Sequence, residues 1–220
     1  MNRLSLEDRA KILSCLVEGN SLRSTSRMCD VSINTVTKLL VDVGQACSDY
    51  QYKTLRNLPC KKIQCDEIWS FCYSKEKNVP RELKGVYGFG DVWTWTAICA
   101  DTKLIASYMV GQRDSKYAHF FAKDLASRLA NRVQLTTDGH KLYINAVESA
   151  FAKDIDYAML VKLYGNSANG AEGRYSPGEC CGTIKGAVCG NPEMKDVSTS
   201  YVERQNLTMR MSMRRFTRLT

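Results

Sequence analysis

Three short amphipathic helices are predicted at the start of the chain. Apolar residues recur at helical spacing from Leu6 to Val17 and from Ile33 to Val43, and a shorter segment of the same kind runs from Leu22 to Met28. Ser5 and Ser32 stand directly before two of these segments, and serine is a favoured N-cap. Residues 1–45 are therefore expected to form a helical module.

The second and third helices predict a helix-turn-helix motif, in which outward side chains of the last helix enter the major groove of DNA. The residues expected to face inward are Ile33, Val36, Leu39, Leu40 and Val43. Asn34, Thr35 and Lys38 are left facing outward and are the candidate DNA-binding residues. Because the first fifty residues carry as many acidic as basic side chains, a dimerisation or purely structural module is the alternative.

A different pattern begins near residue 62. Strands are predicted at residues 63–72, 91–100, 104–110, 133–137 and 158–163. Helices are predicted from Asp114 or Ser115 to Ala130, at residues 142–151, and from Ser200 onward. Because parallel neighbours need a crossover connection, the helix before the fourth strand implies that this strand runs parallel to an earlier one, most naturally the first. The order predicts a mixed α/β domain.

Two segments have no clear element pattern. Residues 46–61 are polar and basic, with Pro59 near the end, which suits a linker. Glycine and polar residues dominate residues 165–199, so we expect a long loop or inserted excursion outside the core there.

Three carboxylates are predicted to converge in the α/β domain. Asp66 lies within the first strand, Asp138 ends the fourth, and Glu203 stands in the first turn of the last helix. If the two strands are neighbours, the aspartates meet at one edge of the sheet, where a helix can bring Glu203 to them. Strand alternation is expected to turn Glu67 to the opposite face.

Clustered carboxylates repel one another unless cations bind among them. Hard oxygen ligands select Mg²⁺ or Mn²⁺, and two such ions about 3.5–4 Å apart can hold the attacking and leaving oxygens of a phosphoryl displacement. The candidate catalytic and metal-binding residues are therefore Asp66, Asp138 and Glu203, with two ions per site. As alternatives, Asp138 with Gly139 makes an ordinary turn, and Glu67 or Asp91 replaces Asp66.

The last predicted helix places Glu203 beside a row of arginines. Arg210 and Arg214 fall on the face of Glu203, where they would hold DNA phosphates. The apolar stripe of this helix is Val202, Met209, Met213 and Phe216. The alternative is a capping box of Ser200 and Glu203, with the arginines as a solvated face.

The charge of the chain indicates one class of partner. The net charge of +8 favours an anionic partner, and the 44% hydrophobic content is enough for a core. Ten scattered cysteines without a C-x-x-C pair, together with two histidines, favour free thiols over disulfides or structural zinc. Without a long apolar run or a secretory pattern at the start, a cytoplasmic, nucleoid-associated protein with no membrane span is expected.

The candidate acids stand in three segments, Gln64–Phe71, Thr136–Tyr143 and Tyr201–Arg210. These segments resemble the catalytic blocks of the insertion-sequence-1 type of bacterial DDE transposase. With the helix-turn-helix, the resemblance covers nearly the whole chain, and its third block is the most specific. It implies an RNase H-like catalytic core with Asp66, Asp138 and Glu203 as metal ligands, which cuts transposon ends and joins their 3′ hydroxyls to target DNA.

The sequence differs from that family in two ways. Many relatives carry a cysteine zinc ribbon before the helix-turn-helix, and this sequence has none. Family members also continue past the position of Thr220, so the C-terminus is expected to be truncated.

The expected protein is a transposase with a helix-turn-helix at residues 1–45, a linker at 46–61 and an RNase H-like catalytic domain at 62–220. Its expected partners are double-stranded DNA, as element ends and target, and further copies of itself on that DNA. The alternatives are a truncated, non-catalytic DNA-binding repressor of transposition, and an RNase H-like nuclease or resolvase.

Overall fold

The computed structural model describes residues 4–165 and 180–217. The chain divides into two compact units, one made of residues 1–56 with 204–220 and the other of residues 57–203. No helix among the described residues is long and apolar enough to cross a membrane.

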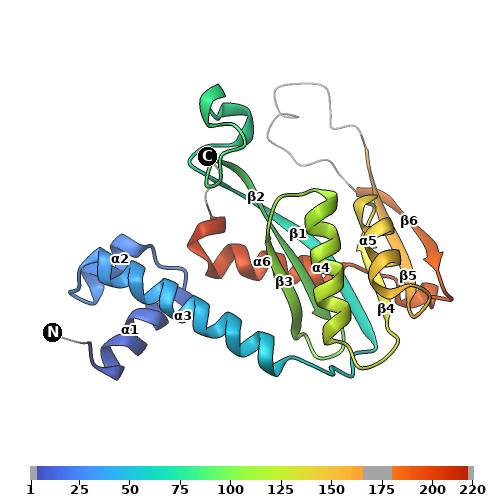
Figure 1. The fold of residues 1–220 in the computed structure, drawn as a ribbon, viewed down its shortest axis with the longest axis horizontal. Helices are drawn as coiled ribbons and strands as arrows, with labels where there is room; N and C mark the ends of the chain where they lie inside the picture. Colours follow the sequence, from blue (N-terminus) through green and yellow to red (C-terminus); the bar gives the residue numbers. More distant parts are fainter. Residues whose placement is uncertain (1–3, 166–179, 218–220) are drawn as a thin grey trace. The chain divides into compact units, whose positions relative to one another are not determined.

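The first unit contains the three predicted helices (Figure 1). They are α1 (Leu6–Val17), α2 (Leu22–Met28) and α3 (Ile33–Thr54). A serine side chain caps each one by accepting a backbone N–H: Ser5 from Asp8 at 3.0 Å, Ser21 from Ser24 at 3.1 Å and Ser32 from Asn34 at 3.3 Å. The predicted caps at Ser5 and Ser32 are confirmed.

Helix α3 is longer than its sequence pattern predicts. It continues to Thr54, so most of the segment expected to be a linker is helical. Polar side chains stabilise this extension, since Gln45 donates a hydrogen bond to Asp49 one turn later at 2.8 Å. Such a segment has no apolar stripe to reveal it. Within the predicted inward stripe of α3, Val36 is fully buried while Ile33 and Leu40 are exposed.

The second unit is built on a six-stranded mixed sheet in the order β3-β2-β1-β4-β5-β6. Its strands are β1 (Lys62–Cys72), β2 (Gly90–Cys99), β3 (Ile105–Gly111), β4 (Gln134–Asp138), β5 (Asp156–Tyr164) and β6 (Cys180–Cys189). Strands β1, β4 and β5 are parallel, while β2, β3 and β6 run antiparallel to their neighbours. The predicted parallel pairing of the first and fourth strands is confirmed, and so is the predicted mixed α/β arrangement.

Helices α4 (Ser115–Arg128) and α5 (Leu142–Phe151) cover one face of this sheet and enclose its main core (Figure 1). Trp95 stands at the centre of that core with no exposed surface. Its ring lies 5.9 Å from Phe121 of α4 and 5.5 Å from Tyr143 of α5. These contacts fix both helices on the sheet.

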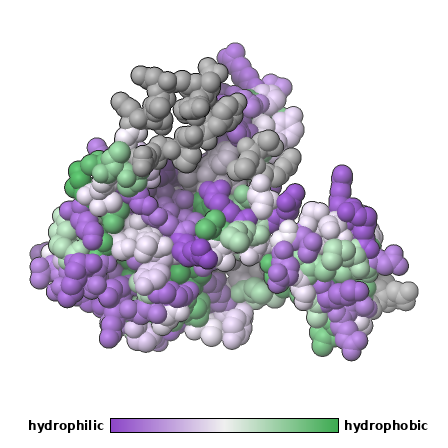
Figure 2. Space-filling model, turned by 180° about the vertical axis from the view of Figure 1, so that it is seen from behind, coloured by the Kyte–Doolittle hydropathy of each residue, from purple (hydrophilic) through white to green (hydrophobic). Residues whose placement is uncertain are grey.

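The other face of the sheet is more polar along its central strands. It carries Gln64 and Asp66 on β1 and Thr136 on β4, next to a small apolar cluster that includes Leu160 of β5. Figure 2 shows the molecule from behind, where hydrophilic residues predominate and hydrophobic ones form small separate groups.

Strand β6 corrects the expectation that residues 165–199 form only a loop or excursion. It pairs with β5 from Tyr157 opposite Cys189 to Tyr164 opposite Cys180. Its side chains are mostly exposed, so backbone pairing rather than an alternating burial pattern forms this strand. The part of that expectation that falls on residues 166–179 lies outside the described residues.

Helix α6 (Ser200–Ser212) is shorter than predicted. The backbone becomes extended at Met213, and a 3-10 turn follows at Arg214–Phe216. The predicted stripe is therefore divided, with Val202 and Met209 buried on the helix and Met213 half exposed after it. In a continued helix, Arg210 and Arg214 would be neighbours on the surface, one turn apart, and their like charges would repel. This repulsion favours a helix end at Ser212. The end of the predicted helix, at residues 218–220, lies outside the described residues.

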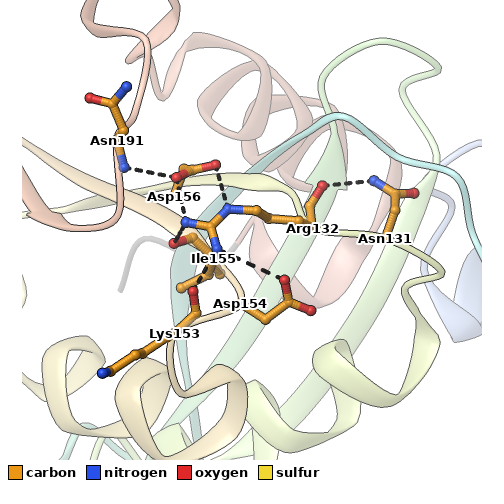
Figure 3. Close-up of polar contacts among 7 residues, drawn as sticks. All are labelled: Asn131, Arg132, Lys153, Asp154, Ile155, Asp156 and Asn191. Carbon is orange, nitrogen blue, oxygen red and sulfur yellow. Dashed lines mark hydrogen bonds and ion pairs between the residues drawn. The ribbon is translucent and has the colours of Figure 1, made fainter.

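A network centred on Arg132 ties β4, β5 and the turn after β6 together (Figure 3). The Arg132 guanidinium contacts Asp156 through two hydrogen bonds, at 2.9 and 2.7 Å, and donates to the carbonyl groups of Lys153 and Ile155. Asp156 also accepts the backbone N–H of Asn191 at 2.8 Å. The network thus anchors the segment that leads from the sheet to α6.

Candidate active site

A cleft of about 540 Å³ lies where β4 ends and β5 nears its end. Asp66, Asp138 and Glu203 all line it. All three residues belong to the second unit, so the fold of that unit alone brings the three predicted site residues to one cleft.

Strand pairing brings Asp66 and Asp138 together. The parallel register sets Gln64 beside Thr136 and Cys65 beside Thr137, so the next position along sets Asp66 beside Asp138 on the same face. Asp138 also accepts the backbone N–H of His140 at 3.0 Å. Asp138 therefore both stabilises the turn after β4 and lines the cleft.

Glu67 joins the two aspartates, which strand alternation does not predict. Ligand oxygens of Asp66, Glu67 and Asp138 all lie within 4.8 Å of one another. The Glu67 carboxylate pairs with Arg113 at 3.0 Å, and the same guanidinium reaches Asp138 at 3.8 Å. Glu67 leaves β1 on the face opposite Asp66, as alternation predicts, and it does not line the cleft. Its longer side chain and the shared arginine nevertheless bring its carboxylate close to the two aspartates.

Burial raises the pKa of Glu67 to about 7. The nearby carboxylates of Asp138 and Asp66 add to this rise, and the Arg113 guanidinium opposes it. Burial also lowers the pKa of His140, which lines the same cleft. The first shift disfavours the carboxylate form of Glu67, and the second disfavours the protonated form of His140.

Both carboxylate oxygens of Glu203 have partners within the second unit. Thr199 donates its hydroxyl to one oxygen at 2.5 Å, and the Lys162 ammonium contacts the other at 2.5 Å. This ion pair raises the pKa of Lys162. With Ser200 as the first helical residue, these contacts replace the capping box considered between Ser200 and Glu203.

A side chain of β1 fixes the start of α6. The side-chain oxygen of Gln64 accepts the backbone N–H groups of Tyr201 at 2.8 Å and Val202 at 3.1 Å. The first N–H groups of a helix have no partner within it, so Gln64 acts as an N-terminal cap from the sheet. Because Gln64 stands two residues before Asp66, it links the position of Glu203 to that of Asp66.

The remaining predicted residues belong to the first unit. Asn34 and Lys38 are exposed and Thr35 is half-buried, with Lys38 paired to Asp42 at 2.8 Å. Arg210 is exposed on α6. Arg214 is exposed in the following 3-10 turn, so the prediction that it shares a helix with Glu203 is wrong.

Asp91, an alternative to Asp66, has a different contact. Its carboxylate accepts the backbone N–H of Glu76 at 3.0 Å and so holds the β1–β2 connection.

The group of three acids at this edge of the sheet fits a hard cation. Asp66, Glu67 and Asp138 offer only carboxylate oxygens, which Mg²⁺ and Mn²⁺ prefer. A cation among them would relieve the repulsion that helps to raise the pKa of Glu67. The predicted ligand set contains Glu203 in place of Glu67. Glu203 lines the cleft, but its carboxylate contacts Lys162.

No family model matches the chain, and no curated protein matches it in sequence. Among solved structures, it is similar to a piggyBac transposase in a synaptic complex with hairpin DNA, with 11% identity and a TM-score of 0.42. It is also similar to an Argonaute from Kluyveromyces polysporus with a guide RNA, with 13% identity and a TM-score of 0.28. The matches cover 96% and 98% of this chain, but only 58% and 34% of those chains. At such TM-scores, function must be argued from the cleft itself.

Proposed function

We propose that this protein is a metal-dependent enzyme of the DDE transposase type that cuts DNA and joins the cut ends to a target. The observation that carries the proposal is the single cleft lined by Asp66, Asp138 and Glu203. Neighbouring parallel strands and a helix start supply these acids, and the resemblance of three sequence segments to transposase blocks falls on the same residues.

In this proposal Asp66 and Asp138 hold Mg²⁺ or Mn²⁺, and Glu203 completes the ligand set when Lys162 releases it. The bound ions would lower the pKa of a water molecule and stabilise charge on the phosphate during displacement. Arg113 keeps Asp138 and Glu67 in place through its two contacts. Lys162, once released, stands in the cleft as a cation for a DNA phosphate.

DNA-end recognition is assigned to Asn34, Thr35 and Lys38 of α3, and phosphate contacts to Arg210 and Arg214. Double-stranded DNA is the proposed substrate, with several copies of the chain acting together on it.

Conservative substitutions of the acids test the proposal. Asp66→Asn, Asp138→Asn and Glu203→Gln each remove charge at nearly constant shape, so each should abolish Mn²⁺-dependent nicking and joining of duplexes taken from either side of the gene. Gel analysis measures the products, and duplex binding in EDTA should persist. Asp154→Asn, at an exposed carboxylate in the same unit, should cut normally. Cutting at the wild-type rate by any cleft variant would remove that residue from the site.

The contact between Lys162 and Glu203 favours a second candidate, a non-catalytic DNA-binding repressor, since a lysine already neutralises one proposed ligand. Wild-type protein that binds these duplexes but neither nicks nor joins them with either metal would support the repressor.

A further inference from the structure

We propose that an aromatic row beside the cleft binds unpaired nucleotides of a DNA strand. The row consists of Trp69 and Phe71 on β1, Trp93 on β2, and Tyr73 just after β1. The inference rests on the proposed function only in its choice of DNA as the nucleic acid.

Trp69, Phe71 and Trp93 leave their strands on one face of the sheet. Trp69 and Phe71 are two positions apart on β1, and their ring centroids lie 5.6 Å apart. Trp93 stands opposite Trp69 in the antiparallel register. Tyr73 follows with 69% of its surface exposed and makes an edge contact with Phe89 at 5.2 Å.

The row continues the sheet face that α4 and α5 cover, but it lies beyond the core. Cys65 and Trp95 belong to the main buried cluster, whereas Trp69, Phe71 and Trp93 remain partly exposed. Figure 1 shows the β1–β2 connection projecting past the end of α4. Aromatic pairs also stabilise a hairpin, but that role alone does not require cations over the rings.

Two cations lie over rings of the row. The Lys75 ammonium lies 5.6 Å from the ring centroid of Trp69, and the Arg113 guanidinium lies 4.7 Å from that of Trp93. The β1–β2 connection adds Lys77, Arg81 and Lys84, all exposed. Stacking rings combined with phosphate-binding cations are typical of surfaces that bind single strands.

Arg113 joins the row to the acids. The same guanidinium that covers Trp93 pairs with Glu67 and approaches Asp138. Asp66 and Asp138 leave the sheet on its other face, so Arg113 is the side chain that connects the row to the acids. Side chains on one strand face repeat at about 6.8 Å, roughly twice the 3.4 Å rise of duplex DNA, so the row suits a strand whose bases are no longer stacked on one another.

Tryptophan fluorescence of the full chain in EDTA tests this surface without any cutting. The probe is a single-stranded thymidine oligonucleotide of about 12 nucleotides, compared with a duplex of the same length. Because Trp95 is fully buried, the signal that stacking changes comes from Trp69 and Trp93. Wild-type protein should show quenching and should bind the single strand more tightly than the duplex.

The row variants should lose this binding. Trp69→Ala and Phe71→Ala should each weaken single-strand affinity by about tenfold, measured by anisotropy of a labelled oligonucleotide. Trp69→Phe should keep the affinity within about threefold while losing much of the quenching. The matched control is Phe120→Ala, because Phe120 is an exposed ring of α4 with Lys116 at 5.8 Å, and it should bind as wild type.

Unchanged single-strand affinity in both alanine variants would overturn the proposal and leave the row as a hairpin-stabilising cluster. If those variants fail to fold, crosslinking of wild-type protein to a bromodeoxyuridine oligonucleotide decides, since crosslinks confined to segments outside residues 69–93 would also overturn it. Cleavage defects in the acid variants would leave these outcomes unchanged, so the two proposals fail separately.

Discussion

The buried carboxylate of Glu67 lies close to two other acids, Asp66 and Asp138, and to one arginine. Its carboxylate pairs with Arg113, which also approaches Asp138. Burial raises the pKa of Glu67 to about 7 against the opposing effects of Tyr143 and Arg113. A cation bound beside it would change that balance.

Glu67→Gln should flatten the pH dependence of stability in EDTA. Between pH 4.5 and 7 the folded protein holds this proton more tightly than the unfolded chain, so stability is full below that window and is lost as the pH rises through it. The loss amounts to at most about 3 kcal/mol. The variant should therefore match wild type near pH 4.5 and exceed it near pH 8, measured by urea denaturation.

The exposed Glu148 of α5 supplies the control for this comparison. Glu148→Gln should keep the wild-type profile. Parallel profiles for Glu67→Gln and wild type would show that Glu67 does not titrate in this window.

At the scale of elements, the start of α6 depends on a contact from the sheet. Gln64 is 4% exposed and accepts two helix N–H groups. Because these bonds span 137 and 138 residues of sequence, they orient the first turn of α6 over β1. The position of Glu203 thus depends on a neutral side chain outside the acid cluster.

Gln64→Leu should destabilise the protein by about 1–2 kcal/mol, because one buried and one part-buried N–H group lose their acceptor. It should also lower Mn²⁺-dependent cutting by about tenfold, if Glu203 shifts enough to cost about 1.4 kcal/mol in the transition state. Thermal denaturation and gel assays measure the two effects.

Gln134 provides a matched control, since its side chain makes a comparable pair of bonds to the backbone of Glu193. Gln134→Leu should lose similar stability with a smaller loss of cutting. Equal losses of cutting in both variants would indicate a general packing effect rather than placement of Glu203.

At the scale of the whole molecule, the proposed functions are divided between two units. The acids, their arginine and lysine partners and the aromatic row all belong to the second unit, while α3 belongs to the first. Recognition of DNA ends and cutting should therefore be separable by substitution.

Replacing Asn34, Thr35 and Lys38 together by alanine should weaken binding to specific duplex ends. Each lost base contact should cost about 1–3 kcal/mol of discrimination, while single-strand binding by the aromatic row should persist. Footprinting on duplex ends measures the first effect and fluorescence the second. Lys11→Ala, at an exposed lysine of α1, is the control. An unchanged footprint for the triple variant would assign the three-helix module a structural or dimerisation role.

Most helices and strands of this protein could be predicted from local sequence patterns. Helices α2 and α5 have the predicted bounds, and β1 to β5 begin and end within two residues of the predicted strands. These elements have strong apolar periodicity or clear stop signals, which are local properties. The same patterns correctly predicted that the strands of Asp66 and Asp138 pair in parallel, because a helical crossover restricts how two strands can pair. The helix-turn-helix assignment remains a prediction.

Features that depend on partners distant in sequence could not be predicted in this way. Strand β6 exists through backbone pairing with β5, and its exposed side chains carry no periodic signal. Glu67 reaches the aspartates through Arg113, 46 residues away, and Glu203 contacts Lys162, 41 residues away. Periodicity indicates the face of the sheet or helix on which a side chain begins. The position of the charged end of a long side chain depends on the charges that the fold places around it.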